Sequence, residues 1–188
     1  QQGVNLSLIT SADKRVQINN QALWSHNIDE TIDLVGHHLW PHRMRVTQAK
    51  RTVNSRVLGH LLGDFSVLDL AYGATVEIKP EEAPDFYLVH IPLSGYSELH
   101  YGSVHTSSTP DAISISSPSA LSYVRMDEQS RHLNIRIDRT TLEDHLCGLI
   151  GHEIYSPLVF ALETPSQSAA GSALINTLDS LFTQTTSE

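Results

Sequence analysis

Two short segments contain residue types that could form a catalytic site, and both lack a residue that the chemistry requires. Residues 152–156 read His-Glu-Ile-Tyr-Ser and begin like the zinc-binding helix of metalloproteases, but Ser156 replaces the second histidine. Gly95 and Ser97 begin like a nucleophile elbow, yet Leu99 replaces the closing glycine. The chain has one cysteine and no glycine-rich phosphate loop, which argues against a zinc finger or nucleotide site. We therefore predict that the chain is not an enzyme.

The chain is rich in histidine, a side chain that can contact a metal or a ligand, with eleven copies in 188 residues. His90 lies in an almost entirely apolar run, residues 86–93, which we expect to be a central strand. Alternation places His90 on one face and Tyr87 on the other. A buried imidazole needs a hydrogen-bond partner, which is usually structural but inside a barrel can be a bound ligand. Tyr123 and Arg125 share one face of their own expected strand and are candidates for the same cavity.

The composition is that of an ordinary globular domain, with 40% hydrophobic and 18% charged residues. The net charge of −9 makes this segment a poor candidate for binding DNA phosphates. No apolar run approaches the roughly 20 residues of a membrane span, and no signal peptide is visible. The single cysteine, Cys147, excludes an internal disulfide, and we expect a buried, inert thiol. We therefore expect a cytoplasmic location without membrane contact.

Five of the twelve basic residues lie between positions 43 and 56. They are Arg43, Arg45, Lys50, Arg51 and Arg56. Such a run is most often a solvated face, but it could also be an anion-attracting edge beside a ligand cavity. Both interpretations remain open from the sequence.

A helix is expected after residues 1–23, which we interpret as an arm or a short strand. Asn27 and Glu30 have the spacing of a capping box, and apolar residues follow at intervals of three and four up to Leu39. His37 and His38 fall in the last turn, and Pro41 ends the helix.

The middle of the chain consists of short alternating segments separated by turn residues. The expected strands are 43–48, 57–62, 65–72, 75–79, 86–93, 96–101, 104–107, 112–116, 121–126 and 132–138. This number and spacing predict an antiparallel β-barrel or jelly roll.

Two helices are expected to end the chain. The first covers about 141–150, with Thr140 and Glu143 as its capping box and Gly151 just beyond its end. The second begins near Ser166 and carries an apolar stripe. The stripe consists of Ala170, Ala173, Leu174, Leu178, Leu181 and Phe182. It must be covered either by its own barrel or by another subunit, and we predict a homodimer through it.

Four segments together resemble the cupin-like sensor domain of AraC/XylS-family transcription regulators. They are residues 40–46 (Trp-Pro-His-Arg-Met-Arg-Val), 63–73, 85–95 and 136–142 (Arg-Ile-Asp-Arg-Thr-Thr-Leu). The resemblance covers about residues 25–183. It implies a mainly β, cupin-like barrel with one N-terminal and two C-terminal helices. It divides the chain into an arm (1–24), the sensor barrel (25–165), and a helix with the start of a linker (166–188).

The resemblance also implies a function. The domain would bind a small organic effector, aromatic or carboxylate, without a cofactor or metal. It would control promoter DNA and RNA polymerase only through a helix-turn-helix domain that is absent here. The candidate ligand contacts are Trp40, Arg43, Tyr87, His90, His100, Tyr123 and Arg125. Arg43 or Arg125 would hold a carboxylate, because a guanidinium group matches its geometry.

Two alternatives come from other classes of protein. One is a metal-dependent cupin enzyme, such as a dioxygenase or an isomerase. The hairpin 96–102, however, has only His100, which Glu98 precedes, and His132 is the one distant candidate ligand. The other is a carbohydrate-binding jelly roll, which would bind sugar on an outer face of a sheet.

Overall fold

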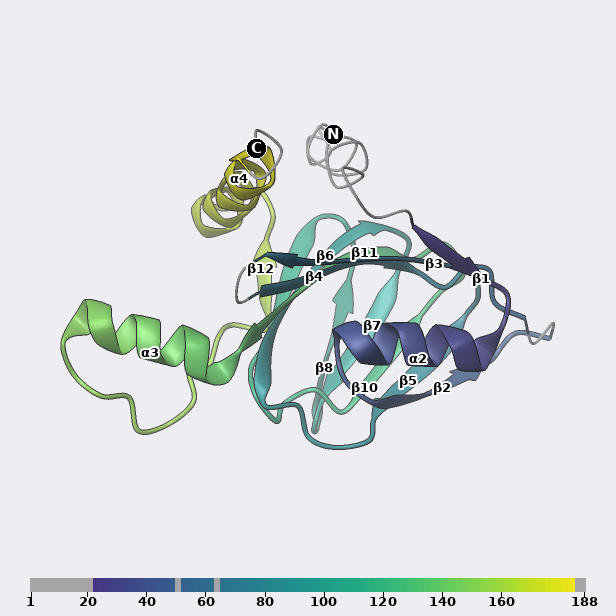
Figure 1. Cartoon of the computed structure of the whole chain (residues 1–188), viewed down its shortest axis with the longest axis horizontal. Helices are drawn as coiled ribbons and strands as arrows, with labels where there is room; N and C mark the ends of the chain where they lie inside the picture. The colour runs from purple at the N-terminus through teal and green to yellow at the C-terminus, as the bar shows by residue number, and fades with distance from the viewer. Residues whose placement is uncertain (1–21, 50–51, 63–64, 185–188) are drawn as a thin grey trace.

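Two antiparallel sheets face each other in the computed structural model, which describes residues 22–49, 52–62 and 65–184 (Figure 1). The first sheet has the order β1-β3-β4-β11-β6-β9-β12 and the second the order β2-β5-β10-β7-β8. The predicted mainly β, cupin-like barrel or jelly roll is confirmed, with one helix before the main strands and two after them.

The strand bounds are close to those expected from the sequence. The seven-stranded sheet contains β1 (Leu23–Ser25), β3 (Ser55–Leu62), β4 (Phe65–Ala71), β11 (Arg131–Asp138), β6 (Phe86–Ser94), β9 (Ala112–Ser116) and β12 (Glu163–Pro165). The five-stranded sheet contains β2 (His42–Val46), β5 (Val76–Pro80), β10 (Tyr123–Met126), β7 (Ser97–Tyr101) and β8 (Val104–Ser108). β12 was not predicted, because three residues that include a proline show no alternation. The expected N-terminal arm lies largely outside the described residues.

The main core fills the space between the two sheets. Apolar side chains from alternate positions of both sheets pack there, among them Leu68, Leu70, Val76, Leu99 and Met126. A second, smaller cluster lies on the outer face of the seven-stranded sheet. The central strands of this sheet are therefore covered on both faces.

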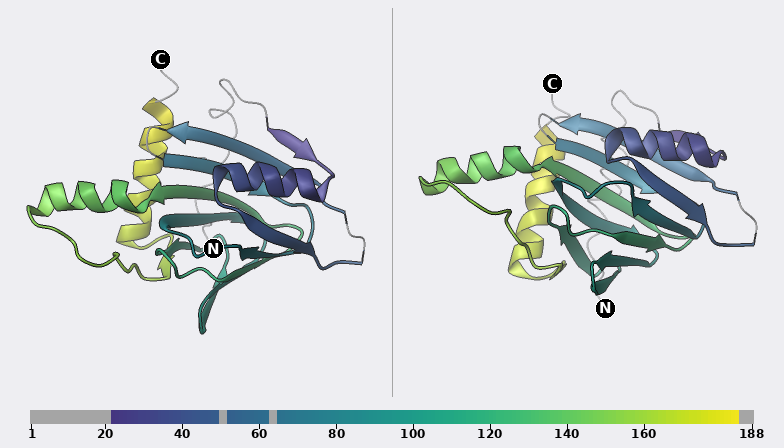
Figure 2. Two further views of the ribbon diagram at one scale, coloured as in Figure 1. Left: turned by 60° about the horizontal axis from the view of Figure 1, so that its bottom comes forward. Right: turned by 90° about the horizontal axis from the view of Figure 1, so that it is seen from below.

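Helix α2 (Ile28–His38) lies over one opening between the sheets (Figures 1 and 2). The predicted cap is confirmed, since Asn27 Oδ1 accepts hydrogen bonds from the amides of Asp29 and Glu30. Val35 and Leu39 enter the main core. The helix ends just before Pro41, as expected from its sequence.

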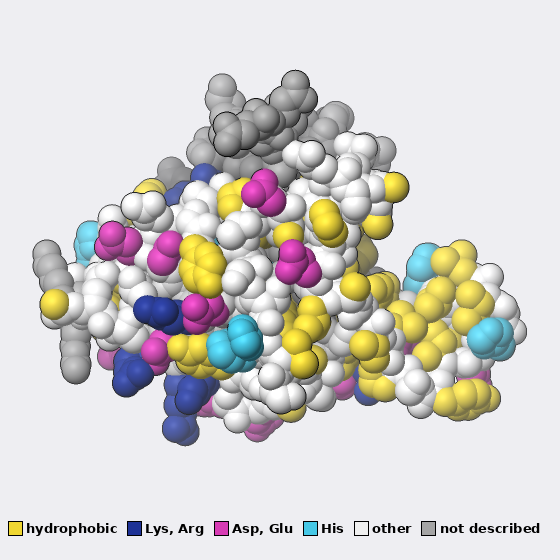
Figure 3. Space-filling model, turned by 180° about the vertical axis from the view of Figure 1, so that it is seen from behind, with side chains coloured by type: hydrophobic (Ala, Val, Ile, Leu, Met, Phe, Trp, Pro, Cys, Tyr) yellow, Lys and Arg dark blue, Asp and Glu magenta, His cyan; other side chains and the backbone are white. Residues whose placement is uncertain are grey.

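Helix α3 (Arg139–Ile150) projects away from the sheets and buries none of its residues (Figure 1). The predicted capping box is wrong: Asp138 is the N-cap residue and makes no side-chain cap bond, and Glu143 binds Arg139 and Tyr87 instead. Cys147 is half-buried, which corrects the expected burial of its thiol. Figure 3 shows hydrophobic side chains spread over the lobe formed by α3 and the following loop. Leu149 and Tyr155, in that lobe, are 71% and 90% exposed.

Helix α4 (Ala169–Gln184) packs on the outer face of the seven-stranded sheet. Leu174, Ile175 and Leu178 contact the outer cluster of Val67, Val89, Ile113 and Ile135. The buried stripe is therefore rotated from the predicted one: Ile175 joins it, while Ala170 and Ala173 are exposed. Leu174 and Leu178 are thus covered by the sheet of their own chain. The side chains of Leu181 and Phe182 lie outside the described residues. Among the helices that the structure describes, none is both long and apolar enough to cross a bilayer.

Candidate functional site

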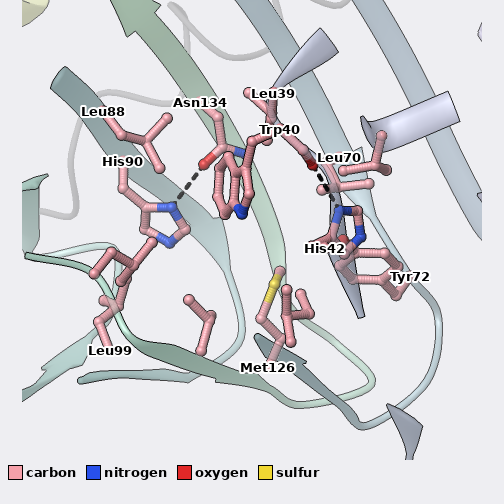
Figure 4. A pocket seen from close by; sticks show the side chains of 14 residues that line it. Leu39, Trp40, His42, Leu70, Tyr72, Leu88, His90, Leu99, Met126 and Asn134 are labelled. Carbon is pink, nitrogen blue, oxygen red and sulfur yellow. Dashed lines mark hydrogen bonds between the residues drawn. The ribbon is translucent and has the colours of Figure 1, made fainter. Parts of the chain in front are cut away.

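A small cavity lies between the two sheets beneath α2 (Figure 4). Its volume is about 30 Å³, enough for about two water molecules. Most of its wall is apolar. The lining residues are Val35, Leu39, Trp40, His42, Leu70, Tyr72, Ile78, Leu88, His90, Leu99, Leu121, Val124, Met126 and Asn134.

Besides Tyr72, which follows β4, the polar side chains of this wall come from three places in the fold. Trp40 lies between α2 and β2, where Pro41 ends the helix, and His42 is the first residue of β2. His90 points inward from β6 because Leu88, two residues earlier, also lines the cavity. Asn134 of β11 pairs directly with His90 across the sheet. In Figure 4 the Trp40 ring lies between the His90 and His42 rings.

Two hydrogen bonds fix the orientation of the two imidazoles in this wall. His90 Nδ1 lies 2.7 Å from Asn134 Oδ1, and His42 Nδ1 lies 3.0 Å from the carbonyl oxygen of Trp40. Because both partners accept, each Nδ1–H donates and each Nε2 carries a lone pair.

Three buried polar atoms of the wall have no hydrogen-bond partner among the described residues. They are Trp40 Nε1, His42 Nε2 and His90 Nε2. An unpaired buried polar atom costs roughly 1–3 kcal/mol, so native proteins rarely keep one. These three atoms are therefore available for hydrogen bonds to a molecule in the cavity, including water.

Burial keeps both imidazoles of the wall uncharged at neutral pH. It lowers the pKa of His90 to about 4, against a smaller upward effect of the Asn134 hydrogen bond. It also lowers the pKa of His42, while the Trp40 carbonyl and Glu81 act in the opposite direction. Both Nε2 atoms therefore act as acceptors.

Two of the seven predicted ligand contacts, Trp40 and His90, line the cavity. Tyr87 is on the opposite face of β6, where its hydroxyl donates to Glu143 at 2.7 Å and accepts from the amide of Leu158 at 2.7 Å. Tyr87 therefore does not line this cavity, because residues at odd spacing along a strand face opposite sides.

The other four, Arg43, His100, Tyr123 and Arg125, lie on the outer face of the five-stranded sheet and not in the cavity. The reason is alternation along each strand, since their neighbours His42, Leu99, Val124 and Met126 point inward and line the cavity. On the outer face the His100 and Tyr123 rings are 4.9 Å apart. The Arg43 side chain is 84% exposed and pairs with Glu81.

The basic run between positions 43 and 56 does not form one edge, so far as the structure describes it. Arg43 and Arg45 pair with Glu81 and Glu77 on the outer face of the five-stranded sheet. Arg56 belongs to the other sheet, where it pairs with Asp69. The solvated-face interpretation holds for Arg43 and Arg45, while Lys50 and Arg51 lie outside the described residues.

The two histidines considered as metal ligands, His100 and His132, lie in different environments. His132 is fully buried and its Nε2 lies 2.8 Å from Ser97 Oγ. His100 faces outward and stacks near His105, with the ring centroids 5.5 Å apart. Within the described part of the chain, no group of three or more His, Cys, Asp or Glu side chains could hold a metal ion.

The end of α2, which contributes Leu39 to the cavity wall, is held by a few specific contacts. Arg136 Nη1 donates to the carbonyl of Leu39 at 2.6 Å, and Ser66 Oγ donates to that of His38 at 3.0 Å. The His38 ring lies directly on Gly59, where a Cβ atom would overlap it. The helix end is thus held by two hydrogen bonds to its carbonyl groups and by the contact of the His38 ring with Gly59.

Two facing antiparallel sheets with this cavity define a cupin-like domain. A family model described as the AraC-binding-like domain matches residues 32–188. The chain belongs to this family, and the predicted relationship to the sensor domain of AraC-family regulators is confirmed.

Two known proteins show how far this relationship extends. A protein named probable thc operon regulatory protein, from Rhodococcus erythropolis, is 27% identical over 163 residues, which cover 85% of this chain and 49% of that protein. The chain therefore spans about half the length of this relative. The crystal structure of the AraC-like transcriptional activator CuxR matches with a TM-score of 0.57 and 14% identity, covering 86% of this chain and 60% of that one. That similarity shows the fold alone.

Proposed function

We propose that the domain binds a small organic effector in the cavity beneath α2 and thereby controls DNA binding by another part of a longer transcription regulator. The observation that carries the proposal is the set of three unpartnered polar atoms, Trp40 Nε1, His42 Nε2 and His90 Nε2, around one cavity. Family membership supports the regulatory role, and the greater length of the Rhodococcus relative leaves room for a DNA-binding part.

The size of the cavity supplies a physical link between effector and response. Sites for organic ligands usually measure roughly 300–1,000 Å³, whereas this cavity measures about 30 Å³. An effector of more than a few atoms therefore requires Trp40 or the end of α2 to move outward. The bound and free domains then differ in the position of α2. The effector would bind the outward position more tightly than the inward one, and this difference in affinity is what a population shift requires.

Native mass spectrometry of freshly purified protein tests the proposal. We expect a co-purified small molecule on the wild-type chain, and its occupancy should fall at least tenfold in His90→Asn. Asparagine keeps a donor for Asn134 but loses the Nε2 acceptor. His105→Asn is the matched control, because His105 lies on the outer face. Full retention of the molecule in His90→Asn, or its loss in His105→Asn, would place the ligand elsewhere.

We further propose that the domain forms a homodimer through the side of α4 that faces away from its own sheet. The exposure of Ala170 and Ala173 supports this, because small residues allow close helix approach. Ala173→Glu should then give a folded monomer in sedimentation velocity. A wild-type chain that stays monomeric at high concentration would contradict the homodimer.

A further inference from the structure

We propose that the lobe formed by α3 and the loop after it, residues 139–162, docks against the basic, DNA-binding part of the longer regulator. This inference rests on the proposed function, because it names the surface through which the domain would control that part. The lobe and the cavity are different regions of the molecule, so each can be tested without the other.

The lobe presents apolar side chains that its own chain leaves uncovered. Of the eight large hydrophobic side chains that are exposed among the described residues, four belong to this lobe. They are Leu149, Ile150, Tyr155 and Val159, with exposed fractions of 71%, 43%, 90% and 87%. Figure 3 shows hydrophobic side chains over much of the lobe. Apolar side chains gathered on one protruding element mark a contact with another molecule or domain.

Specific contacts hold the lobe in this position, away from the sheets. The Tyr87 hydroxyl donates to Glu143 of α3 and accepts from the amide of Leu158 in the loop, both at 2.7 Å. Arg139, the first residue of α3, donates to the same carboxylate at 3.1 Å. The Phe160 ring packs edge-to-face on Tyr87. The apolar surface is therefore preorganised, which reduces the entropy that is lost when a partner binds.

The charge of the lobe determines which partner fits it. All twelve Lys and Arg residues of the chain precede residue 140, whereas residues 140–188 contain six Asp and Glu residues. Asp144 and Glu153 are exposed on the lobe itself. A second copy of the lobe would bring like charges together, which opposes binding, whereas a basic surface would be attracted. A part that binds DNA phosphates must carry such a basic surface.

The length of the Rhodococcus relative leaves room for a part of this kind. The present chain matches 49% of that protein, which is named a regulatory protein. A longer regulator of that size therefore has a second part beside this domain, and this part is the occupant that we propose for the lobe.

Arg136 connects the lobe to the element that the proposed effector would move. Its Nη1 donates to the Leu39 carbonyl at the end of α2 at 2.6 Å, and its Nη2 donates to Asp138 Oδ1 at 3.0 Å. Asp138 is the N-cap residue of α3. A shift of the end of α2 would therefore disturb the start of the lobe, where the docked part would sense it.

Hydroxyl-radical footprinting measures the exposure of single side chains and can compare this domain alone with the purified longer protein, both without effector and DNA. Labelling of Leu149 and Tyr155 should fall roughly fivefold or more in the longer protein, because the core of an interface excludes water. Tyr96, which is 41% exposed and lies between β6 and β7, should be labelled equally in both proteins.

Charge reversal in the longer protein tests the choice of partner. The double variant Asp144→Lys, Glu153→Lys should restore most of the lost labelling, because it places positive charges against a basic surface. Glu128→Lys is the matched control and should leave the protection in place. Glu128 is an exposed acid just before β11, whereas α3 follows the other end of that strand. Tyr72, which is 1% exposed, should stay unlabelled and so confirms that each variant is folded.

Two results would overturn the docking proposal. One is equal labelling of Leu149 and Tyr155 in the two wild-type proteins, a comparison that needs no variant. The other is a fall in their labelling in the domain alone as its concentration rises, which would assign the surface to a second copy. Protection that survives the double variant would overturn the choice of a basic partner. The mass spectrometry described above uses the domain alone, so a failure of docking leaves the proposed effector binding untouched.

Discussion

The imidazole rings of His90 and His132 pack against each other with their centroids 4.0 Å apart. His132 is held by Ser97, and its Nδ1 has no partner among the described residues. Burial lowers the pKa of His132 well below its usual value, and the nearby His90 lowers it further. The pair is therefore stable only while both rings are uncharged.

Stability should fall as the pH is lowered from about 6.5 towards 4. The unfolded chain binds a proton at each histidine near pH 6.5, whereas folded His90 does so only near pH 4. The stabilisation is thus fully present above pH 6.5, and His90 alone should lose on the order of 3 kcal/mol across this window. Urea denaturation at pH 7.5 and pH 5 measures the loss. His90→Asn should flatten the dependence, and equal slopes in variant and wild type would contradict the assignment.

The side chain of Asp69 should be a main electrostatic contribution to stability. It accepts from Arg131 Nε at 2.8 Å and from Arg56 Nη1 at 2.6 Å. Its burial raises its pKa, but the two guanidinium groups outweigh this and lower it. Asp69→Asn should therefore cost roughly 3 kcal/mol in the free energy of unfolding. Asp85→Asn, whose carboxylate is 71% exposed, is the control and should change it by less than about 0.5 kcal/mol.

Gly59→Ala should loosen the end of α2. The new methyl group would overlap the His38 ring, so the ring or the helix end must move. We expect a loss of about 1–2 kcal/mol in the free energy of unfolding, together with faster hydrogen exchange at the last turn of α2. Gly36→Ala changes the same helix at a position with open space, and should instead stabilise it by up to about 1 kcal/mol. Similar effects of both substitutions would show that His38 does not hold the helix.

Leu178→Glu should destabilise the domain and not merely separate subunits. Leu178 packs on the outer cluster of the seven-stranded sheet, so a carboxylate there would cost about 2 kcal/mol or more. Ala173→Glu lies on the exposed side of α4 and should lower thermal stability much less than Leu178→Glu does. If Leu178→Glu unfolds like the wild type, the helix does not depend on this contact.

The fold was predictable from local patterns, because each of its elements carries its own signal. Asn27 marks the start of α2, and the alternating runs place the strands to within a few residues. The start of α3 was less certain, since Glu143 has the spacing of a cap but binds a distant tyrosine. A residue with two possible partners can be assigned only when the tertiary structure is known.

The site was predictable only in part, because a strand does not reveal which of its faces is inside. On β11, Leu133 and Ile135 look like the core face and Asn134 like the wet one. The structure reverses this, since α4 covers the outer face and Asn134 points to the cavity. His42 was missed for another reason: it follows Pro41, so its sequence context indicates a turn and not the first residue of a strand. On β10, by contrast, the apolar pair Val124 and Met126 could have indicated the inward face.

The two shortest strands occupy the ends of the seven-stranded sheet. At one end is β12, where Pro165 pairs with Ala112 and has no amide hydrogen to offer to another chain. Its carbonyl already accepts from Ser168. An incoming strand therefore finds neither a donor nor a free acceptor at this proline, which disfavours edge-to-edge pairing at this end of the sheet.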